Sequence, residues 1–168
     1  MTHPVNLALL VLRVVFGLFL AYHGYNKFFG GGRLPGTARW FGSIGFRAPR
    51  LQAVLAASTE VGAGVLLAAG LLTPLAAAAV IGVMVVAIVS SHWRVGFFIF
   101  KEGGGWEYCA SILVAAFAIG AIGAGEWSLD EAFGIHFHGW VGTVIAAAAG
   151  IGGGLAQLGL FYRPKPSS

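Results

Sequence analysis

Residues 51–72 read LQAVLAASTEVGAGVLLAAGLL, and this stretch decides the class of fold. It is long enough to cross a bilayer, because about 20 mostly apolar residues with a rise of about 1.5 Å each cover about 30 Å of hydrocarbon. Glu60 nevertheless lies close to its middle. A charged group at that depth costs roughly 2.5 kcal/mol or more on insertion, unless a partner meets it inside a helical bundle. The stretch therefore predicts a membrane helix with a buried polar contact.

The whole chain has the composition of an integral membrane protein. Of its 168 residues, 58% are hydrophobic and only 10% are charged, which is more apolar than a soluble domain needs. The formal charge of +4 does not indicate a nucleic-acid-binding protein, because no Lys/Arg tract is dense enough to follow phosphates. Cys109 is the single cysteine, which excludes an intrachain disulfide, a CxxC pair and an all-cysteine metal site in one chain.

Five apolar runs each predict a helix, because backbone polar groups in hydrocarbon must be satisfied within the segment. They cover residues 5–28, 51–72, 75–93, 107–124 and 140–161. We expect an all-α integral membrane protein. Residues 1–131 form a four-helix transmembrane bundle, and residues 132–168 add a fifth span and a basic tail. The first run lacks a basic segment before it and contains Arg13, so we interpret it as a retained span and not as a secretory signal.

The connections between the runs carry their own signals. Gly70 suits a helix end, Thr73 a cap and Pro74 the first turn of the next helix, so the second and third spans should form an antiparallel hairpin. Residues 30–50 mix aromatic residues with arginines, and Thr37 suits the cap of a short helix at the membrane surface.

The charges of the connections predict the orientation. One side collects the basic residues Lys27, Arg33, Arg39, Arg47, Arg50, Arg94, Lys101, Arg163 and Lys165. The other side holds Glu126, Asp130 and Glu131 and has no Lys or Arg. The positive-inside rule places the first side, with the C-terminus, in the cytoplasm and the N-terminus outside.

Polar residues within the spans fall at related depths. Arg13 and Glu60 lie about 12 Å and about 13 Å along adjacent antiparallel spans from opposite faces, so we expect them to form an ion pair near the midplane. Other acid–base groups fall in the cytoplasmic half of three helices. The expected buried polar cluster is Arg13, Glu60, His23, Lys27, His92, Glu107 and Tyr108.

Such a cluster can bind a quinone head group, since these side chains hydrogen-bond to its oxygens and exchange protons with them. A purely structural pairing of Arg13 and Glu60 remains open. Lys27 is expected to snorkel to the interface, and Tyr108 can belong to the aromatic belt.

Alternative ligands and contacts have weaker signals. His23 and His92 can serve as axial haem ligands, although histidines at span ends are commonly structural. His136 and His138 are a weak metal signal without a third ligand, so we expect no metal. Gly150 and Gly154 form a GxxxG step that can drive dimerisation, but we expect packing within the chain.

Several motifs together resemble the DoxX family of small bacterial membrane proteins. They are HGYNKFFG at residues 23–30, EVGAG at 60–64, GLLTPLAA at 70–77, His92 with GFF at 96–98, GGWEY at 104–108 and SLD at 128–130. The resemblance covers about residues 8–131 and implies a helical bundle in the bacterial inner membrane. It also implies redox work, because relatives resemble the small subunit of an archaeal thiosulfate:quinone oxidoreductase. Others are associated with a mycobacterial membrane complex that contains a superoxide dismutase and a sulfurtransferase.

These observations favour a quinone- or thiol-redox-linked membrane subunit that works with a soluble redox enzyme at the cytoplasmic face. The alternative is a non-catalytic scaffold that anchors such an enzyme through residues 30–50. A small transporter ranks last, because five spans leave little room for a pathway in a monomer, although a homo-oligomer would change that. No self-sufficient catalytic motif is present, so whether the chain is itself an oxidoreductase subunit stays open.

Overall fold

The computed structural model describes residues 1–164, and the regular structure in this part of the chain is helical, with one isolated β-bridge. The helices are α1 (His3–Phe29), α2 (Arg33–Ser43), α3 (Pro49–Ala69), α4 (Thr73–Ala87), α5 (Glu107–Ile122), α6 (Leu129–Ala132), α7 (Gly139–Val144) and α8 (Gly150–Phe161). Two π-helical turns, η1 (Ile88–His92) and η2 (Ile145–Ala149), continue α4 and join α7 to α8.

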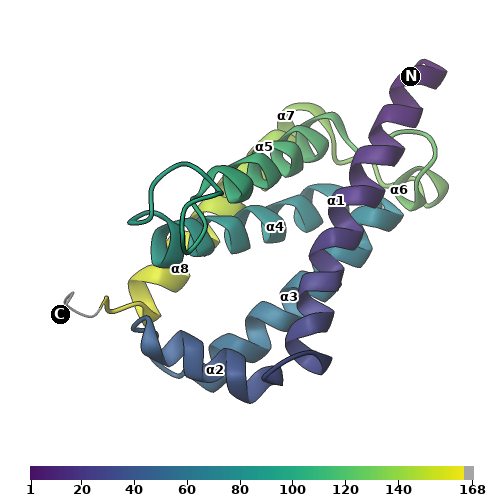
Figure 1. Ribbon diagram of the computed structural model, residues 1–168. Coiled ribbons are helices and arrows are strands. Elements are labelled where there is room, and N and C mark those ends of the chain that lie inside the picture. Colours follow the sequence, from purple (N-terminus) through teal and green to yellow (C-terminus); the bar gives the residue numbers. More distant parts are fainter. Residues whose placement is uncertain (165–168) are drawn as a thin grey trace.

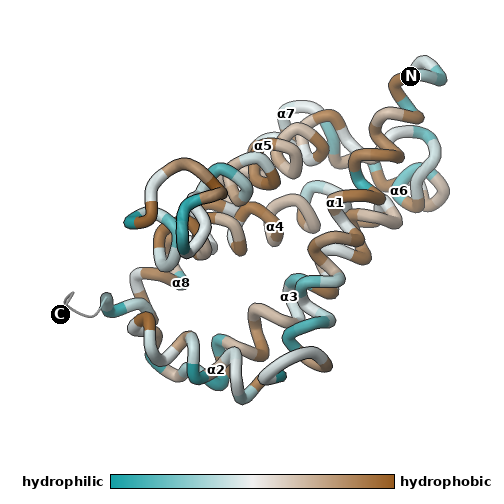
Figure 2. The backbone as a smooth tube through the Cα atoms, in the orientation of Figure 1, coloured by the Kyte–Doolittle hydropathy of each residue, from teal (hydrophilic) through white to brown (hydrophobic). Residues whose placement is uncertain are grey.

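The predicted membrane architecture is confirmed. Four helical segments are long and apolar enough to cross a bilayer: His3–Phe29, Pro49–Ala69, Thr73–His92 and Gly139–Phe161. The last of these is α7, η2 and α8 together, so the fifth apolar run has the length of a span. The shorter apolar helix is α5, as its run predicted. Figure 2 shows apolar residues along most of these helices, which suits surfaces in contact with lipid.

The helices are arranged so that the two ends of the bundle differ (Figure 1). The N-terminus, the α3–α4 turn and α6 lie at one end, where Asp130 N–H donates to the carbonyl of Gly70 at 2.8 Å. We call this the acidic end. The other end, which we call the basic end, holds α2 and the end of α8. Arg33, Arg39, Arg47, Arg50, Arg94, Lys101 and Arg163 are exposed near it, and Lys165 lies outside the described residues.

Close helix contact builds each half of the bundle. α1 packs along α3, and α4 packs against α5 and α8. The α1–α3 contact depends on two glycines: a β-carbon on Gly17 would lie 2.5 Å from the carbonyl oxygen of Gly64, and one on Gly64 equally close to that of Gly17. Such backbone contact is typical of membrane helices, where small residues maximise van der Waals packing.

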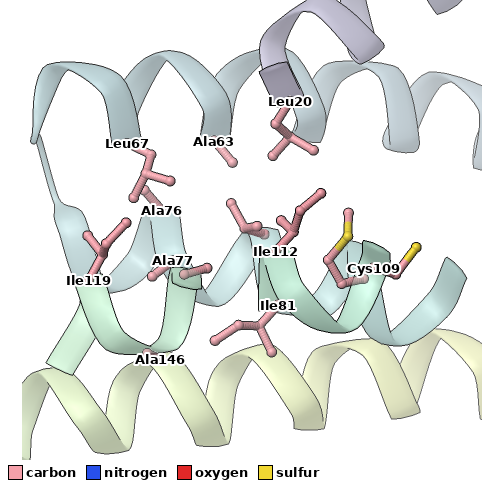
Figure 3. Packing of buried hydrophobic residues seen from close by; sticks show 13 residues of the cluster. Leu20, Ala63, Leu67, Ala76, Ala77, Ile81, Cys109, Ile112, Ile119 and Ala146 are labelled. Carbon is pink, nitrogen blue, oxygen red and sulfur yellow. The ribbon is translucent and has the colours of Figure 1, made fainter. Parts of the chain in front are cut away.

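The main hydrophobic core joins α1, α3, α4, α5 and η2 (Figure 3). Leu67, Ile81 and Ile119 are almost fully buried in it. A second, smaller cluster lies at the basic end, where Phe41 and Phe46 pack against Leu158 of α8. Phe46 also forms the antiparallel bridge with Tyr162, so the α2–α3 connection and the end of α8 hold each other.

Two predicted caps need correction. Gly70 does end α3 in a left-handed conformation (φ +66°), but Thr73 does not cap α4. Asp130 does so from 57 residues away: its Oδ1 accepts from Leu72 N–H at 2.7 Å and its Oδ2 from Thr73 N–H at 2.9 Å. Thr37 lies inside α2, which begins at Arg33, and its hydroxyl donates to the Arg33 carbonyl. Local sequence could not show that a distant carboxylate takes the role of the cap.

Candidate functional site

A cavity of about 690 Å³ lies between the two halves of the bundle. It is lined by α1, α2 and α3 on one side and by α4, η1, α5, η2 and α8 on the other. Its volume is within the range of about 300–1,000 Å³ that is common for ligand sites. Most of its lining is apolar, and its polar lining residues are His23, Lys27, Thr59, Glu60, Ser90, His92, Tyr108, Cys109 and Gln157.

These polar residues are not spread evenly along the cavity. Lys27 is near the end of α1, and His92 and Tyr108 flank the connection from η1 to α5 at the basic end. Toward the acidic end the wall is formed by side chains such as Leu20 and Leu75. The cavity is therefore amphipathic, with a polar head region and an apolar remainder.

Glu60 is paired with Lys27 and not with Arg13, which corrects the predicted ion pair. Lys27 Nζ lies 2.5 Å from Glu60 Oε2, with the Glu60 side chain 8% exposed and that of Lys27 23% exposed. Lys27 therefore does not snorkel as predicted. The reason is the direction of side chains: each leans toward the N-terminus of its own helix, so Lys27 and Glu60 on antiparallel helices lean toward each other.

The same rule sends Arg13 away from Glu60, toward the acidic end. Arg13 is 2% exposed; its Nη1 donates to the Ala68 carbonyl at 2.5 Å and its Nη2 donates to the Trp127 carbonyl. Ala68 lies in the last turn of α3 and Trp127 in the connection between α5 and α6, both at the acidic end. The depth count failed here because it does not record the direction in which a side chain leans.

His92 is held with a defined tautomer at the edge of the cavity. Its Nδ1 lies 2.6 Å from the Gly104 carbonyl oxygen. Because a carbonyl only accepts, Nδ1 must carry the proton, and Nε2 is left as the nitrogen that can accept one. The residue lies in a π turn, where Trp93 N–H donates to the Ile88 carbonyl at 2.8 Å. Such turns are frequent at functional sites.

The structure brings five of the seven predicted cluster residues to the cavity: Glu60, His23, Lys27, His92 and Tyr108. Arg13 is not among its lining residues, and neither is Glu107. Glu107 instead accepts a hydrogen bond from Ile99 N–H at 3.2 Å and so holds the connection between η1 and α5.

A glutamine pair was missed by the sequence analysis. Gln157 Nε2 on α8 donates to Gln52 Oε1 on α3 at 2.7 Å. Gln52 is completely buried, and its own Nε2 has no hydrogen-bond partner. The available signal was the presence of two amides within apolar runs, which have no reason to face lipid.

At the acidic end, a second polar network closes the bundle. Asn6 Nδ2 donates to Glu126 Oε2 at 2.8 Å, and Glu126 N–H donates to Asn6 Oδ1 at 3.0 Å. The hydrogen bonds of Glu126 with the Met1 amine and with Asn6 lower the pKa of the Glu126 carboxyl below its ordinary value. Together with Arg13 and Asp130, these bonds fasten residues 125–130 to α1 and α4.

The remaining sequence signals resolve simply. The rings of His136 and His138 are 6.4 Å apart, and Glu131 is 4.0 Å from His136. Within residues 1–164, no group of three or more His, Cys, Asp or Glu gathers to hold a metal ion.

Gly150 packs against α4, where a β-carbon on it would lie 2.8 Å from the Ala78 carbonyl oxygen, which agrees with the predicted packing within the chain. The expectation that His23 and His92 have a structural role and do not bind a haem stays a prediction.

Comparison with known proteins confirms the resemblance for the motifs up to His92, whereas those at residues 96–98, 104–108 and 128–130 lie outside the matched segment. The model of the DoxX family matches residues 8–93, which run from α1 to just beyond η1. No match was found among the curated proteins or among the solved structures. The family match covers half of the chain, and the chain therefore belongs to the DoxX family. The matched segment ends before α5 and α8. The predicted division of the chain into residues 1–131 and 132–168 therefore stays a prediction.

Proposed function

We propose that this member of the DoxX family binds a lipid-soluble quinone in the cavity and acts as the membrane subunit of a redox system. The observation that carries the proposal is one apolar cavity of about 690 Å³ with its acid–base groups gathered toward one end. An apolar chamber inside a bilayer selects a ligand from the lipid phase. The polar region then favours a ligand whose head group accepts hydrogen bonds and protons.

The cavity offers a ligand a path from lipid. Phe19 of α1 and Leu55 of α3 line it and are 53% and 43% exposed, so neither side chain is covered by the neighbouring helices. These positions border the cavity where helices of the two halves face each other. A quinone would enter sideways, place its tail against the apolar wall and bring its head toward the basic end.

The polar residues can supply what quinone chemistry needs from a protein. Reduction to the hydroquinone takes up two electrons and two protons. The Lys27–Glu60 pair, Nε2 of His92 and the Tyr108 hydroxyl can exchange protons with the head. The electrons come from a soluble redox enzyme that carries the redox centre and docks at the basic end. The chain itself provides binding and protonation.

The experiment measures the thermal stability of the purified protein with and without a short-chain ubiquinone. A ligand that binds only the folded state stabilises it by RT ln(1 + L/Kd) at a free ligand concentration L, so the melting temperature rises with the logarithm of the ligand concentration once that exceeds Kd. Tyr108→Phe should reduce the shift, because the hydroxyl contact is lost. Tyr22→Phe is the matched control, since Tyr22 is 70% exposed and does not line the cavity. Absence of any shift with the wild type would refute quinone binding.

The orientation belongs to the same proposal: the basic end faces the cytoplasm and the N-terminus faces outward. Basic residues are retained on the cytoplasmic side during insertion. In a Cys109→Ala background, Thr2→Cys should react with an impermeant maleimide in intact cells and Ser43→Cys should not. The reverse pattern would invert the topology.

A second candidate function is a scaffold without chemistry of its own. It is favoured by the exposed arginines of α2 and the following connection, among them Arg39 and Arg47. Charge reversal by Arg39→Glu and Arg47→Glu should abolish capture of the soluble partner in a pull-down. If the quinone-induced stabilisation survives in that variant, docking and ligand binding are separate properties. If the wild type captures the partner but no quinone stabilises it, the scaffold function stands alone.

A further inference from the structure

Within residues 1–164, the Gln52–Gln157 pair presents a buried hydrogen-bond donor that has no partner. Two amides together carry four N–H donors and two carbonyl acceptors. One bond joins them, from Gln157 Nε2 to Gln52 Oε1 at 2.7 Å. The Nε2 of Gln52 is buried without a partner. A buried donor without an acceptor destabilises the fold, so its retention in an apolar setting calls for an explanation.

The pair lies at the cavity. Gln157 lines it, and Gln52 is completely buried behind it on α3. If each amide is rotated by half a turn, so that its Oε1 and Nε2 exchange positions, Gln52 donates to Gln157. The NH₂ group of Gln157 is then free for a ligand. The one bond uses one N–H group and one carbonyl, so three N–H groups and one carbonyl remain in either orientation, and donors predominate. A ligand that satisfies these donors must offer an acceptor oxygen.

The position complements the ion pair already described. Gln52 and Glu60 are eight residues apart, which is about 12 Å along α3. That length accommodates one six-membered ring with a hydrogen bond at either end. Gln157, which bonds to Gln52, and Glu60 both line the cavity, and we expect the head of a ligand with two opposed oxygens to fit between them.

We propose that the Gln52–Gln157 pair is a second polar anchor in the cavity, through which α8 selects a ligand whose head carries acceptor oxygens on opposite sides. This inference rests on the proposed quinone function and adds the residue that determines specificity. Gln157 lies outside residues 8–93, the part that the DoxX model matches. The part of the anchor that Gln157 supplies therefore belongs to α8, within the fifth span of this chain.

The test compares two probes of equal tail length, decylubiquinone and decylbenzene, by equilibrium binding to the full chain in lipid nanodiscs. Gln157→Leu keeps the size of the side chain and removes its donors. It should weaken decylubiquinone about 3- to 10-fold, as expected for one lost hydrogen bond, and leave decylbenzene unchanged. Leu160→Ala is the control on the same helix, because Leu160 is 65% exposed and does not line the cavity.

The possible failures are distinguishable. If the wild type does not bind decylubiquinone, the proposed function falls and this inference with it. If the wild type binds and Gln157→Leu binds equally well, only the anchor is refuted. Where Gln157→Leu fails to fold because Gln52 loses its partner, the double variant Gln52→Leu/Gln157→Leu replaces both amides by apolar groups. That variant should fold and show the same selective loss; unchanged binding by it overturns the anchor.

Discussion

At the acidic end, Arg13 and Asp130 direct their hydrogen bonds to the backbone at the α3–α4 turn and the α5–α6 connection, whereas at the basic end Lys27, Glu60 and His92 surround a cavity. Both sets are polar groups within or beside membrane spans, where such groups are costly. The difference lies in their position relative to the large cavity. Lys27, Glu60 and His92 line the cavity of about 690 Å³ and leave acid–base groups available there, whereas Arg13 and Asp130 are not among its lining residues. Burial alone therefore does not identify the functional residues of this bundle.

Removal of Arg13 should produce the largest loss of stability. Arg13→Met retains most of the apolar stem but leaves the carbonyls of Ala68 and Trp127 without their charged donor. With about 1.5–3 kcal/mol for each such bond, we expect about 3–5 kcal/mol less free energy of unfolding. Unfolding in detergent, followed by circular dichroism, measures it. Leu12→Met, at an exposed neighbour, is the control, and equal stability of the two variants would contradict the structural role.

A smaller effect is expected at the ion pair. Lys27→Met leaves Glu60 buried without its partner and should cost about 2–3 kcal/mol, less than a fully buried pair because Lys27 is partly exposed. The double variant Lys27→Met/Glu60→Leu should recover most of that stability and lose quinone binding. A double-mutant cycle measures the coupling. If the double variant is no more stable than the single one, the pair does not contribute to folding.

The smallest effect is expected at the distant cap. Asp130→Asn keeps one acceptor but turns an amide nitrogen toward the Thr73 N–H or the Leu72 N–H. We expect a cost of about 1–2 kcal/mol and faster hydrogen exchange at these two amides, with quinone affinity unchanged. Glu131→Gln is the matched control, since Glu131 is exposed on the same short helix. Loss of quinone binding in Asp130→Asn would show that the two ends are coupled and not separate.

Much of the fold follows from the sequence, because hydrocarbon permits few alternatives to helices. The five apolar runs predicted the helices, and α1 buries one face that includes Gly17, Leu20 and Gly24. The exact helix ends and caps did not follow. Asp130 reaches α4 from a distant connection, and no local pattern announces such a contact.

The site could be predicted only in part. Residues at the basic ends of their helices, such as His92 and Tyr108, were placed correctly because depth along a span is nearly one-dimensional. The partner of Glu60 was predicted wrongly because depth says nothing of where a side chain leans. Its lean toward the N-terminus of α3 would have selected Lys27 over Arg13. The cavity itself depends on how the two halves of the bundle diverge, which cannot be predicted from the sequence of any single helix.

The hydrogen bond from the Tyr162 hydroxyl to the Ser90 carbonyl, at 3.2 Å, ties the last turn of the chain's final helix to the π turn that carries His92. The bridge between Phe46 and Tyr162 ties the same residue to the α2–α3 connection. Tyr162 therefore joins three parts of the basic end: α8, the α2–α3 connection and the turn that carries His92. If a soluble enzyme docks there as proposed, a displacement of Tyr162 would reach the turn of His92 through this hydrogen bond.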